Sequence, residues 1–338
     1  MRATPVAALA RVAQVHPFLD FFEDIGVPIP ESLSKYALPP GLRENGDILA
    51  ASAAMFAFVA DMARGQGVDN IGWNLPNLDK MDLRLRTKLR GSPTLLNTLN
   101  KVSRYTRLDS NRTTAWLQKQ GDDYYFCHHG SLPVDSNGAD VLTMVRTVLM
   151  LSIIRAHLGR DWCPDEIGFE MTGPISPLVQ ESMGNTRFHC APTYGWIHLP
   201  EETLCRPMLE PPGRAAERSI TDNYIEPQQD LIGSIKQLLQ PYLRDGAPTI
   251  QFAANLVNRS SRSFQRDLSN AGTSYRDLVL EIRFERACQL LLLSDIKIQG
   301  IAFELGYTDP AHFTRFFETV AGVSPLKYRH LPTETQAP

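Results

Sequence analysis

The sequence has little of what would assign a protein class directly. Its 34 Lys and Arg are outnumbered by 37 Asp and Glu, so the net charge is -3 and no positive field covers the whole surface. No glycine elbow, phosphate-binding loop or HExxH run occurs, so the sequence predicts neither an enzyme nor a cofactor. Any affinity for nucleic acid must come from a local surface.

Cysteines and long apolar runs are also scarce. The five cysteines are widely spaced and include no CxxC pair, which is typical of reduced thiols and not of a disulfide framework. Arg11 interrupts the N-terminal stretch MRATPVAALARVA, so we expect an amphipathic helix there and not a signal peptide. The apolar stretch from Ile48 to Ala60 is too short to span a bilayer. These features predict a cytoplasmic protein with no membrane partner.

Length and composition favour two folded domains. The 338 residues exceed the usual domain size of about 100 to 200 residues, and 43% hydrophobic with 21% charged residues is ordinary for a globular protein. Residues 206–228 contain four prolines and many polar groups, which is typical of a linker. The sequence predicts a first domain at 1–208, a linker at 209–228 and an all-α domain at 229–338.

Hydrophobic periodicity predicts an α+β fold for the first domain. Residues 1 to about 105 look mainly helical, and Ser92 with Pro93 is expected to cap and begin one of these helices. Alternating patterns follow, with a two-residue turn at Gly121-Asp122. The expected elements are strands at 112–119 and 123–130, a helix from about Asn137 to His157, and strands at 166–172 and 195–200.

The last hundred residues contain an internal repeat at a shift of 49 residues. FAANLVNRSSRSFQRDL at 252–268 aligns with IAFELGYTDPAHFTRFF at 301–317. In each copy a small residue, Ala253 or Ala302, would let two helices approach closely, and Leu256 or Leu305 would pack the turn. The pattern predicts two helix-turn-helix units.

A second helix is expected to begin in the same place in each copy. Ser260 and Asp309 are N-cap candidates, and Pro310 suits a first helical position. The buried stripe of these helices is predicted to be Phe264 and Leu268 in one copy, and Phe313 and Phe317 in the other. A helix from Tyr275 to Leu293, with Leu278, Ile282, Leu290 and Leu291 on one stripe, would hold the two units in one orientation.

The opposite face of each second helix carries side chains that read bases. Arginine bonds guanine, glutamine bonds adenine, and Thr or Ala contacts a thymine methyl group. The predicted DNA-binding residues are Ser261, Arg262, Gln265, Arg266, Ala311, His312, Thr314 and Arg315. Two such helices about 34 Å apart would enter successive major grooves of double-stranded DNA. The alternatives are two ordinary helical hairpins with solvated faces, or an adaptor whose repeat binds proteins.

Six basic residues lie in or beside this face and are expected to neutralise five or six phosphates: Arg259, Arg262, Arg266, Arg315, Lys327 and Arg329. On the linker helix, Arg283 and Arg286 are expected to pair with the neighbouring Glu281 and Glu285 and so to contribute less.

The residues from about 229 to 331 resemble the DNA-binding domain of AraC/XylS-type bacterial transcription regulators. The most specific stretch is IAFELGYTDPAHFTRFFETVAGVSPLKYR, and RFERACQLLL at 283–292 resembles the family's linker helix. The resemblance implies a seven-helix domain of two units that reads successive major grooves, with the helices near 260–270 and 310–320 as readers. The sequence departs from the family pattern in two places. Val257 stands where the second copy has Gly306, so the first turn is expected to differ. Glu318 and Thr319 follow Phe317, where the family often has basic residues, so fewer phosphate contacts are expected.

Residues 1 to about 208 are more loosely similar to the arabinose-binding-type sensory region of one subgroup of these regulators. The similarity rests on His16-Pro17, SPTLLNTLNKVSRYTRL at 92–108 and GRDWCPDEIGF at 159–169. It implies a small-molecule effector, which we expect between the helix at 137–157 and the strands, and a homodimer. RNA polymerase is a further expected partner. The effector-binding residues stay unknown.

Three other groups of residues carry weaker hypotheses. Cys127, His128, His129, His189, Cys190, His198 and Cys205 suggest a metal site, but alternate strand residues face opposite ways and the spacing fits no compact motif, so we predict no metal. Cys163 is the candidate if the chain were an alkyl-accepting regulator. The basic run of Lys80, Arg84, Arg86, Lys88 and Arg90 is a solvated face or a contact for an anion.

Overall fold

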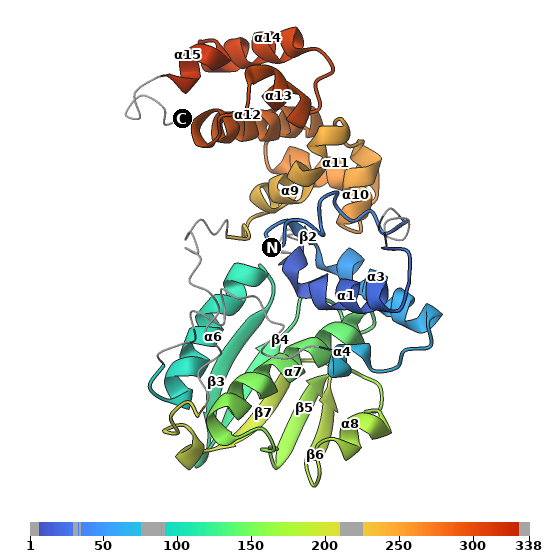
Figure 1. The fold of residues 1–338 in the computed structure, drawn as a ribbon, viewed down its shortest axis with the longest axis vertical. Coiled ribbons are helices and arrows are strands. Elements are labelled where there is room, and N and C mark those ends of the chain that lie inside the picture. The colour runs from blue at the N-terminus through green and yellow to red at the C-terminus, as the bar shows by residue number, and fades with distance from the viewer. Residues whose placement is uncertain are drawn as a thin grey trace. The chain divides into compact units, whose positions relative to one another are not determined.

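The computed structural model describes residues 7–29, 33, 35–75, 89, 92–209 and 226–330. The chain forms two compact units, one of Ala8–Gln228 and one built on Gln229–Pro338 (Figure 1). The first combines helices with two sheets, and the second is helical in its described residues, so the predicted fold class is confirmed. The basic run at 80–90 falls outside the described residues.

The larger sheet of the first unit has five strands. Their order across the sheet is β3 (Thr114–Gln120), β4 (Asp123–His129), β7 (Gly195–Pro200), β5 (Glu166–Glu170) and β6 (Arg187–Ala191). Neighbouring strands are antiparallel except for the parallel pair of β5 and β6. The predicted hairpin is confirmed, with Gly121 in the left-handed region at φ 64°. The edge strand β6 was not predicted.

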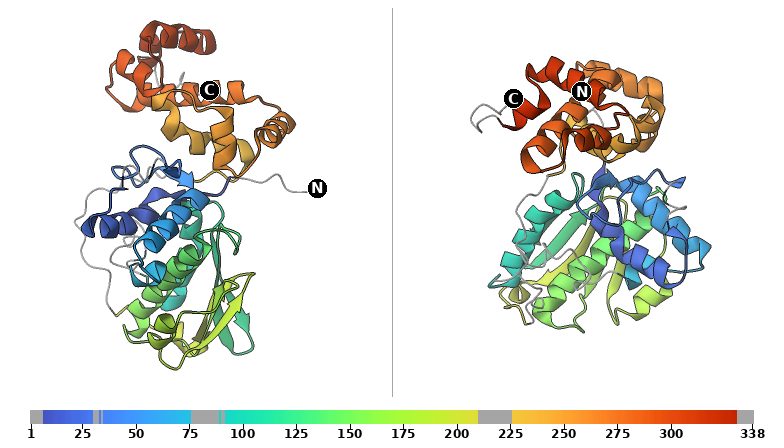
Figure 2. Two further views of the ribbon diagram at one scale, coloured as in Figure 1. Left: turned by 90° about the vertical axis from the view of Figure 1, so that its right-hand side faces the viewer. Right: turned by 45° about the horizontal axis from the view of Figure 1, so that its top comes forward.

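Helices pack on one face of this sheet, as the left panel of Figure 2 shows. The main helices are α6 (Leu95–Asp109), α7 (Ala139–Leu158) and the short α8 (Pro177–Glu181), and a 3-10 turn, η3 (Glu201–Thr203), follows β7. The space between α7 and the strands is filled by a buried cluster that includes Met150, Ile154, Phe126, Ile167 and Ile197. Side chains therefore occupy the place where the sequence suggested an effector pocket.

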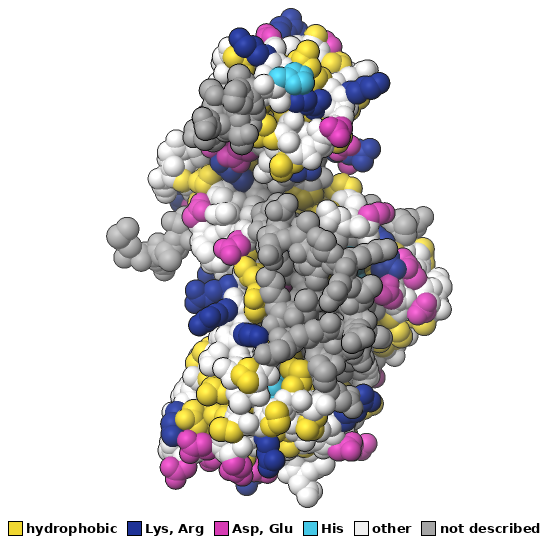
Figure 3. All heavy atoms as spheres, turned by 60° about the vertical axis from the view of Figure 1, so that its left-hand side comes forward, with side chains coloured by type: hydrophobic (Ala, Val, Ile, Leu, Met, Phe, Trp, Pro, Cys, Tyr) yellow, Lys and Arg dark blue, Asp and Glu magenta, His cyan; other side chains and the backbone are white. Residues whose placement is uncertain are grey.

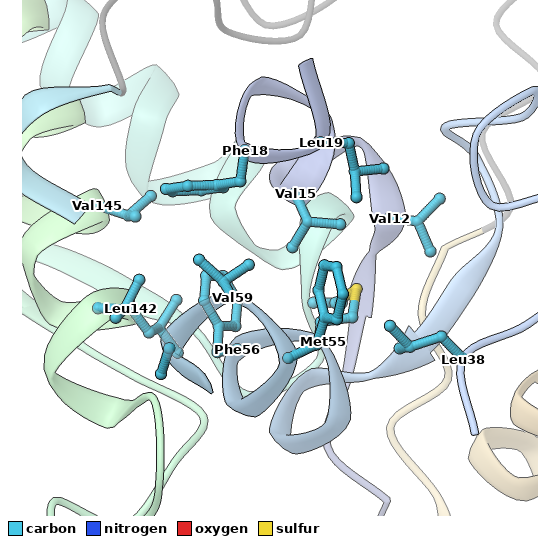
Figure 4. Packing of buried hydrophobic residues seen from close by; sticks show 14 of the residues in the cluster. Val12, Val15, Phe18, Leu19, Leu38, Met55, Phe56, Val59, Leu142 and Val145 are labelled. Atoms are coloured by element: carbon cyan, nitrogen blue, oxygen red, sulfur yellow. The ribbon is translucent and has the colours of Figure 1, made fainter. Parts of the chain in front are cut away.

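The elements at the start of this unit enclose a second hydrophobic core. It is formed by β1 (Leu9–Arg11), η1 (Val12–Val15), α1 (His16–Asp24), β2 (Leu49–Ala51), α3 (Ser52–Gly65) and α4 (Ile71–Asn74). Figure 4 shows Phe18, Phe56 and Val59 packed together with Leu142 and Val145 of α7. The amphipathic helix expected in the N-terminal stretch is wrong for its described residues, because Leu9–Arg11 forms β1 and pairs with β2. Strands of three residues carry too little alternation to detect.

Helix α7 serves both cores and is apolar all round. It is the one helix among the described residues that is long and apolar enough to cross a membrane, and 67% of its most apolar window is buried inside the protein. Such a helix is expected in the centre of a folded domain.

The expected start of α6 was wrong by two residues. Thr94 is the N-cap, and its Oγ1 accepts a hydrogen bond from the Asn97 amide at 3.4 Å. Ser92 is buried and donates instead to the Leu89 carbonyl at 2.9 Å. Both Ser and Thr suit a cap, so the composition alone did not separate them.

The described residues of the second unit form seven α-helices and one 3-10 helix. In chain order these are α9 (Leu231–Leu239), η4 (Gln240–Asp245), α10 (Ile250–Leu256), α11 (Ser261–Asn270), α12 (Tyr275–Leu293), α13 (Ile298–Glu304), α14 (Pro310–Ala321) and α15 (Pro325–Arg329). Lys236 of α9 lies 2.7 Å from Glu281 and 2.8 Å from Glu285, so an ion-pair network joins α9 to α12. The expected bounds of α12 are confirmed.

Candidate nucleic-acid interface

Two pairs of helices, α10 with α11 and α13 with α14, are built alike. The Ser260 hydroxyl accepts a hydrogen bond from the Ser263 amide at 3.2 Å, and the Asp309 carboxylate accepts one from the Ala311 amide at 2.9 Å. Each bond satisfies a backbone donor that the first turn leaves unpaired. Pro310 is the first residue of α14. The predicted caps are confirmed.

Large apolar side chains bury one face of the second helix in each pair. The predicted stripes, Phe264 and Leu268 in α11 and Phe313 and Phe317 in α14, are all buried. The Phe264 ring lies 6.2 Å from Tyr275, and the Phe317 ring lies 5.3 Å from Phe284, so each stripe reaches an aromatic residue of α12. Burial of these stripes leaves the other face of α11 and α14 in solvent.

The predicted readers lie on these two helices with unequal exposure. Six are exposed, namely Arg262, Gln265, Arg266, Ala311, His312 and Arg315. Ser261 is half-buried and donates its hydroxyl to Gln251 of α10 at 2.5 Å. Thr314 is half-buried and donates to the Pro310 carbonyl at 3.1 Å. Both hydroxyls already have an acceptor, so the exposed six have the freer contact with solvent.

Acidic groups stand close to some of these cations. The His312 ring nitrogen lies 3.7 Å from the Asp309 carboxylate, and Arg259 lies 3.9 Å from Asp267. Arg262, Arg266 and Arg315 have no ion pair within the described residues. In Figure 3 the visible face of the second unit shows basic and acidic side chains interspersed. The cationic surface is thus local, as the sequence suggested.

The turns of the two pairs differ in length by one residue. The second helices are related by a shift of 49 residues, from Ser260 to Asp309, but the first helices are related by 48, from Thr249 to Lys297. The alignment of Ala253 with Ala302 was therefore wrong, and the equivalent of Ala302 is Ala254. Both are fully buried.

The left-handed residue of the first turn is Asn258 and not Val257. Asn258 has φ 53° and Gly306 has φ 76°, and the next residue in each turn bonds back to the equivalent alanine carbonyl. Asparagine tolerates this region far better than a β-branched residue. The expected difference between the turns is real, but it lies in their length.

Two other expectations about charged residues need correction. Glu281 and Glu285 pair with Lys236 of α9, while the Arg283 guanidinium lies 4.7 Å from the ring centre of Tyr307, so the expected pairing within α12 is wrong. Arg329 donates to the backbone carbonyls of Leu291 and Ile296, at 3.3 and 2.6 Å. These bonds hold the Arg329 side chain at the end of α12, although the sequence assigned this residue to phosphate contact.

Sequence reasoning missed two residues that connect the helices of this unit. Gln251 holds the start of α11 through Ser261, and Lys236 ties α9 to α12. A polar residue on the outer face of a helix carries no sequence signal for such a contact, because its partner is set by the crossing of two helices.

The cysteine and histidine candidates of the first unit do not come together as one site. Cys127 lies on one face of the sheet, and burial raises the pKa of its thiol to about 11. His128 points to the other face, where Arg146 donates to it at 3.4 Å. Cys163 is half-buried, and its sulfur accepts from Arg155 at 3.5 Å. Among the described residues, no three His, Cys, Asp or Glu side chains are grouped as a metal would need.

Comparison with known proteins bears on the second unit above all. A family model described as a helix-turn-helix domain matches residues 253–330. The ornithine utilization regulator of Pseudomonas aeruginosa is 31% identical over 144 residues, which are 40% of this chain and 42% of that protein. An HTH-type transcriptional regulator of Mycobacterium tuberculosis is 25% identical over 246 residues, which are 70% of each chain. The proteins matched are transcriptional regulators, not enzymes.

A solved structure aligns over nearly the whole chain. The crystal structure of the transcriptional regulator CdpR from Pseudomonas aeruginosa covers 94% of this chain and 98% of its own, with 15% identity and a TM-score of 0.36. The chain spans less than half the length of the ornithine utilization regulator that it matches.

Proposed function

We propose that the chain is a sequence-specific transcription regulator of the AraC type that reads two successive major grooves per monomer, because residues 253–330 match a helix-turn-helix family model. Its activity is controlled by a small-molecule effector held in the first unit. The regulator acts in the cytoplasm, and its partners are double-stranded promoter DNA, RNA polymerase and a second copy of the chain.

One observation carries the reading of two grooves. Helices α11 and α14 each bury an apolar stripe whose phenylalanine contacts an aromatic residue of α12, and each presents a polar face to solvent. A common support fixes the two reading faces relative to one another within the second unit. Two helices held in this way suit major grooves one helical turn, about 34 Å, apart.

The exposed side chains of α11 and α14 suit different bases. Arg262 and Arg266 suit bidentate contacts to guanine, and Gln265 between them suits adenine. On α14, Arg315 suits guanine and Ala311 suits a thymine methyl group. We assign DNA binding to 229–338 on this basis, and we propose 209–228 as the linker and 1–208 as the sensor.

The test is to express residues 229–338 alone. The described apolar stripes of this part close on one another, so the fragment should be helical by circular dichroism and should shift promoter fragments in a gel. Genome-wide mapping of the DNA bound by the full chain supplies those fragments. A folded fragment that binds no DNA, from mapped fragments or from random competitor, would favour the adaptor, in which the repeat binds proteins.

A further inference from the structure

The face of the five-stranded sheet that points away from α6 and α7 carries a hollow of about 190 Å³. Side chains alternate between the two faces of the sheet along each strand. Phe126, Ile167 and Ile197 point into the helix-covered core, so their neighbours in the strands point toward the hollow. The lining of the hollow is mainly aromatic and amide in character: Gln118, Gln120, Tyr125, Cys127, Glu166, Tyr194 and Trp196.

An indole ring forms the floor of this hollow. Trp196 lies flat against Gly168 of the neighbouring strand, where a methyl group would stand 2.3 Å from the indole nitrogen. Tyr125 meets the indole edge to face at 5.3 Å, and the His189 ring lies 5.3 Å from it on the opposite side. The glycine thus leaves room for the indole ring over the neighbouring strand, and Trp196 remains partly exposed.

The rim offers hydrogen bonds without a strong net charge. Gln118 and Gln120 each bring a carboxamide that both donates and accepts. Glu166 is the one charged residue of the lining, and both of its oxygens are engaged, one by Arg187 and one by His189 at 3.3 Å. The site therefore does not select a strongly charged ligand.

We propose that this aromatic hollow is the effector site, and that its ligand is a small planar heteroaromatic molecule with donors and acceptors on its edge. The ligand stacks on Trp196, and the carboxamides of Gln118 and Gln120 bond to its edge. The inference rests on the proposed regulatory function and adds the site and the ligand class to it.

The volume of the hollow limits the size of the ligand. At about 30 Å³ per water molecule in the liquid, 190 Å³ corresponds to roughly six waters, which suits one or two fused rings. Drug-sized ligands occupy larger pockets of about 300 to 1,000 Å³. A nucleotide with its phosphates would exceed the space, and the rim offers it no free cation.

The experiment uses the full chain and measures tryptophan fluorescence and melting temperature against a panel of probes. The planar probes are adenine, hypoxanthine, nicotinamide and indole, and the non-planar probes are L-arabinose and L-arginine. At least one planar probe should alter the emission and raise the melting temperature in a saturable way. Neither non-planar probe should do so.

Variants locate the effect. Gln118→Ala and Gln120→Ala should each weaken binding of the responding probe. Lys119 lies between them and points to the other face of the sheet, so Lys119→Ala should leave binding unchanged. Trp196→Leu removes the stacking surface and should weaken binding roughly 5- to 150-fold. If Trp196→Leu fails to fold, the carboxamide pair and its lysine control still decide the question.

Three outcomes overturn the proposal. They are a panel in which no planar probe acts, a response to L-arabinose or L-arginine alone, and a concentration-dependent dimer in which a second copy covers Trp196. A gel shift on the same protein separates this inference from the proposed function. If the protein binds DNA but responds to no planar probe, the inference alone is wrong. If it responds to a planar probe but binds no DNA, the DNA-binding role alone is wrong.

Discussion

Asn258 and Gly306 hold equivalent left-handed positions in the two helix-turn-helix units, at φ 53° and 76°. The residue after each donates its amide to the carbonyl of a buried alanine, Ala254 at 2.9 Å and Ala302 at 3.0 Å. The same left-handed conformation is therefore adopted by different residues. Their tolerance of substitution should differ, because only Gly306 is pressed against another segment.

Gly306→Ala should destabilise the protein more than a left-handed backbone alone requires. A side chain at this φ costs about 1 to 2 kcal/mol, and a methyl group here would also lie 2.2 Å from the Leu243 carbonyl oxygen. Gly272→Ala is the matched control, since Gly272 has φ 81° but nothing within 4 Å. Urea unfolding of both variants measures the difference, and equal losses would show that the close approach has no cost.

Alanine substitution at Arg262, Gln265, Arg266 or Arg315 should cost about 1 to 3 kcal/mol of binding to the cognate site and much less on random DNA. The reason is that base contacts distinguish sequences and phosphate contacts do not. Arg244→Ala is the control, because Arg244 is exposed on η4 and lies 3.7 Å from Glu304. Equal losses on both DNAs would reassign the residue to phosphate contact.

DNA binding should depend on salt only moderately. Arg329 is engaged by backbone carbonyls and Arg259 lies near Asp267, which leaves four exposed cations: Arg262, Arg266, Arg315 and Lys327. At about 0.9 per phosphate, four contacts give a slope of log K against log salt near -3.6, where six would give about -5.4. Titrations at several salt concentrations decide between them. A slope near zero would contradict the DNA-binding role itself.

The first unit should lose stability in mild acid. Burial holds the pKa of His128 well below its usual value, so the unfolded chain binds a proton that the folded chain does not. The stabilising effect is complete above about pH 6.5 and is lost as pH falls toward the lower folded pKa. Melting temperatures from pH 8 to 5 should fall less steeply in His128→Gln. His157→Gln tests whether the second buried histidine, whose pKa burial also lowers, contributes to the same loss.

The sequence predicted the elements with strong periodicity and missed those without it. Helix α12 and the β3–β4 hairpin carry long regular patterns and were placed well. Strand β6 places only Phe188 in the core and is otherwise open to solvent, so it has no alternation to detect. The repeat was aligned one residue out in its first helix because Ala253 and Ala254 are adjacent, and either can match Ala302.

The candidate site was predictable in part for the same reason. Caps and buried stripes are local features, so Ser260, Asp309 and the four stripe residues were found from the sequence. The engagement of Arg329 by carbonyls of α12 depends on how α15 meets α12, more than thirty residues away along the chain. No local sequence pattern predicts a contact between residues so far apart along the chain. The contact of the Trp196 indole with Gly168 of the next strand is another example.

The unequal turns mean that the second unit has no internal two-fold axis. Its two outer helices differ in their side chains and in the length of chain that leads into them, so reversing the molecule end for end would present each groove with a different surface. A monomer bound to DNA would thus face in one direction only. If the second unit reads promoter DNA as proposed, its site has two different ends, and inverting the site would reverse the direction in which the bound unit faces.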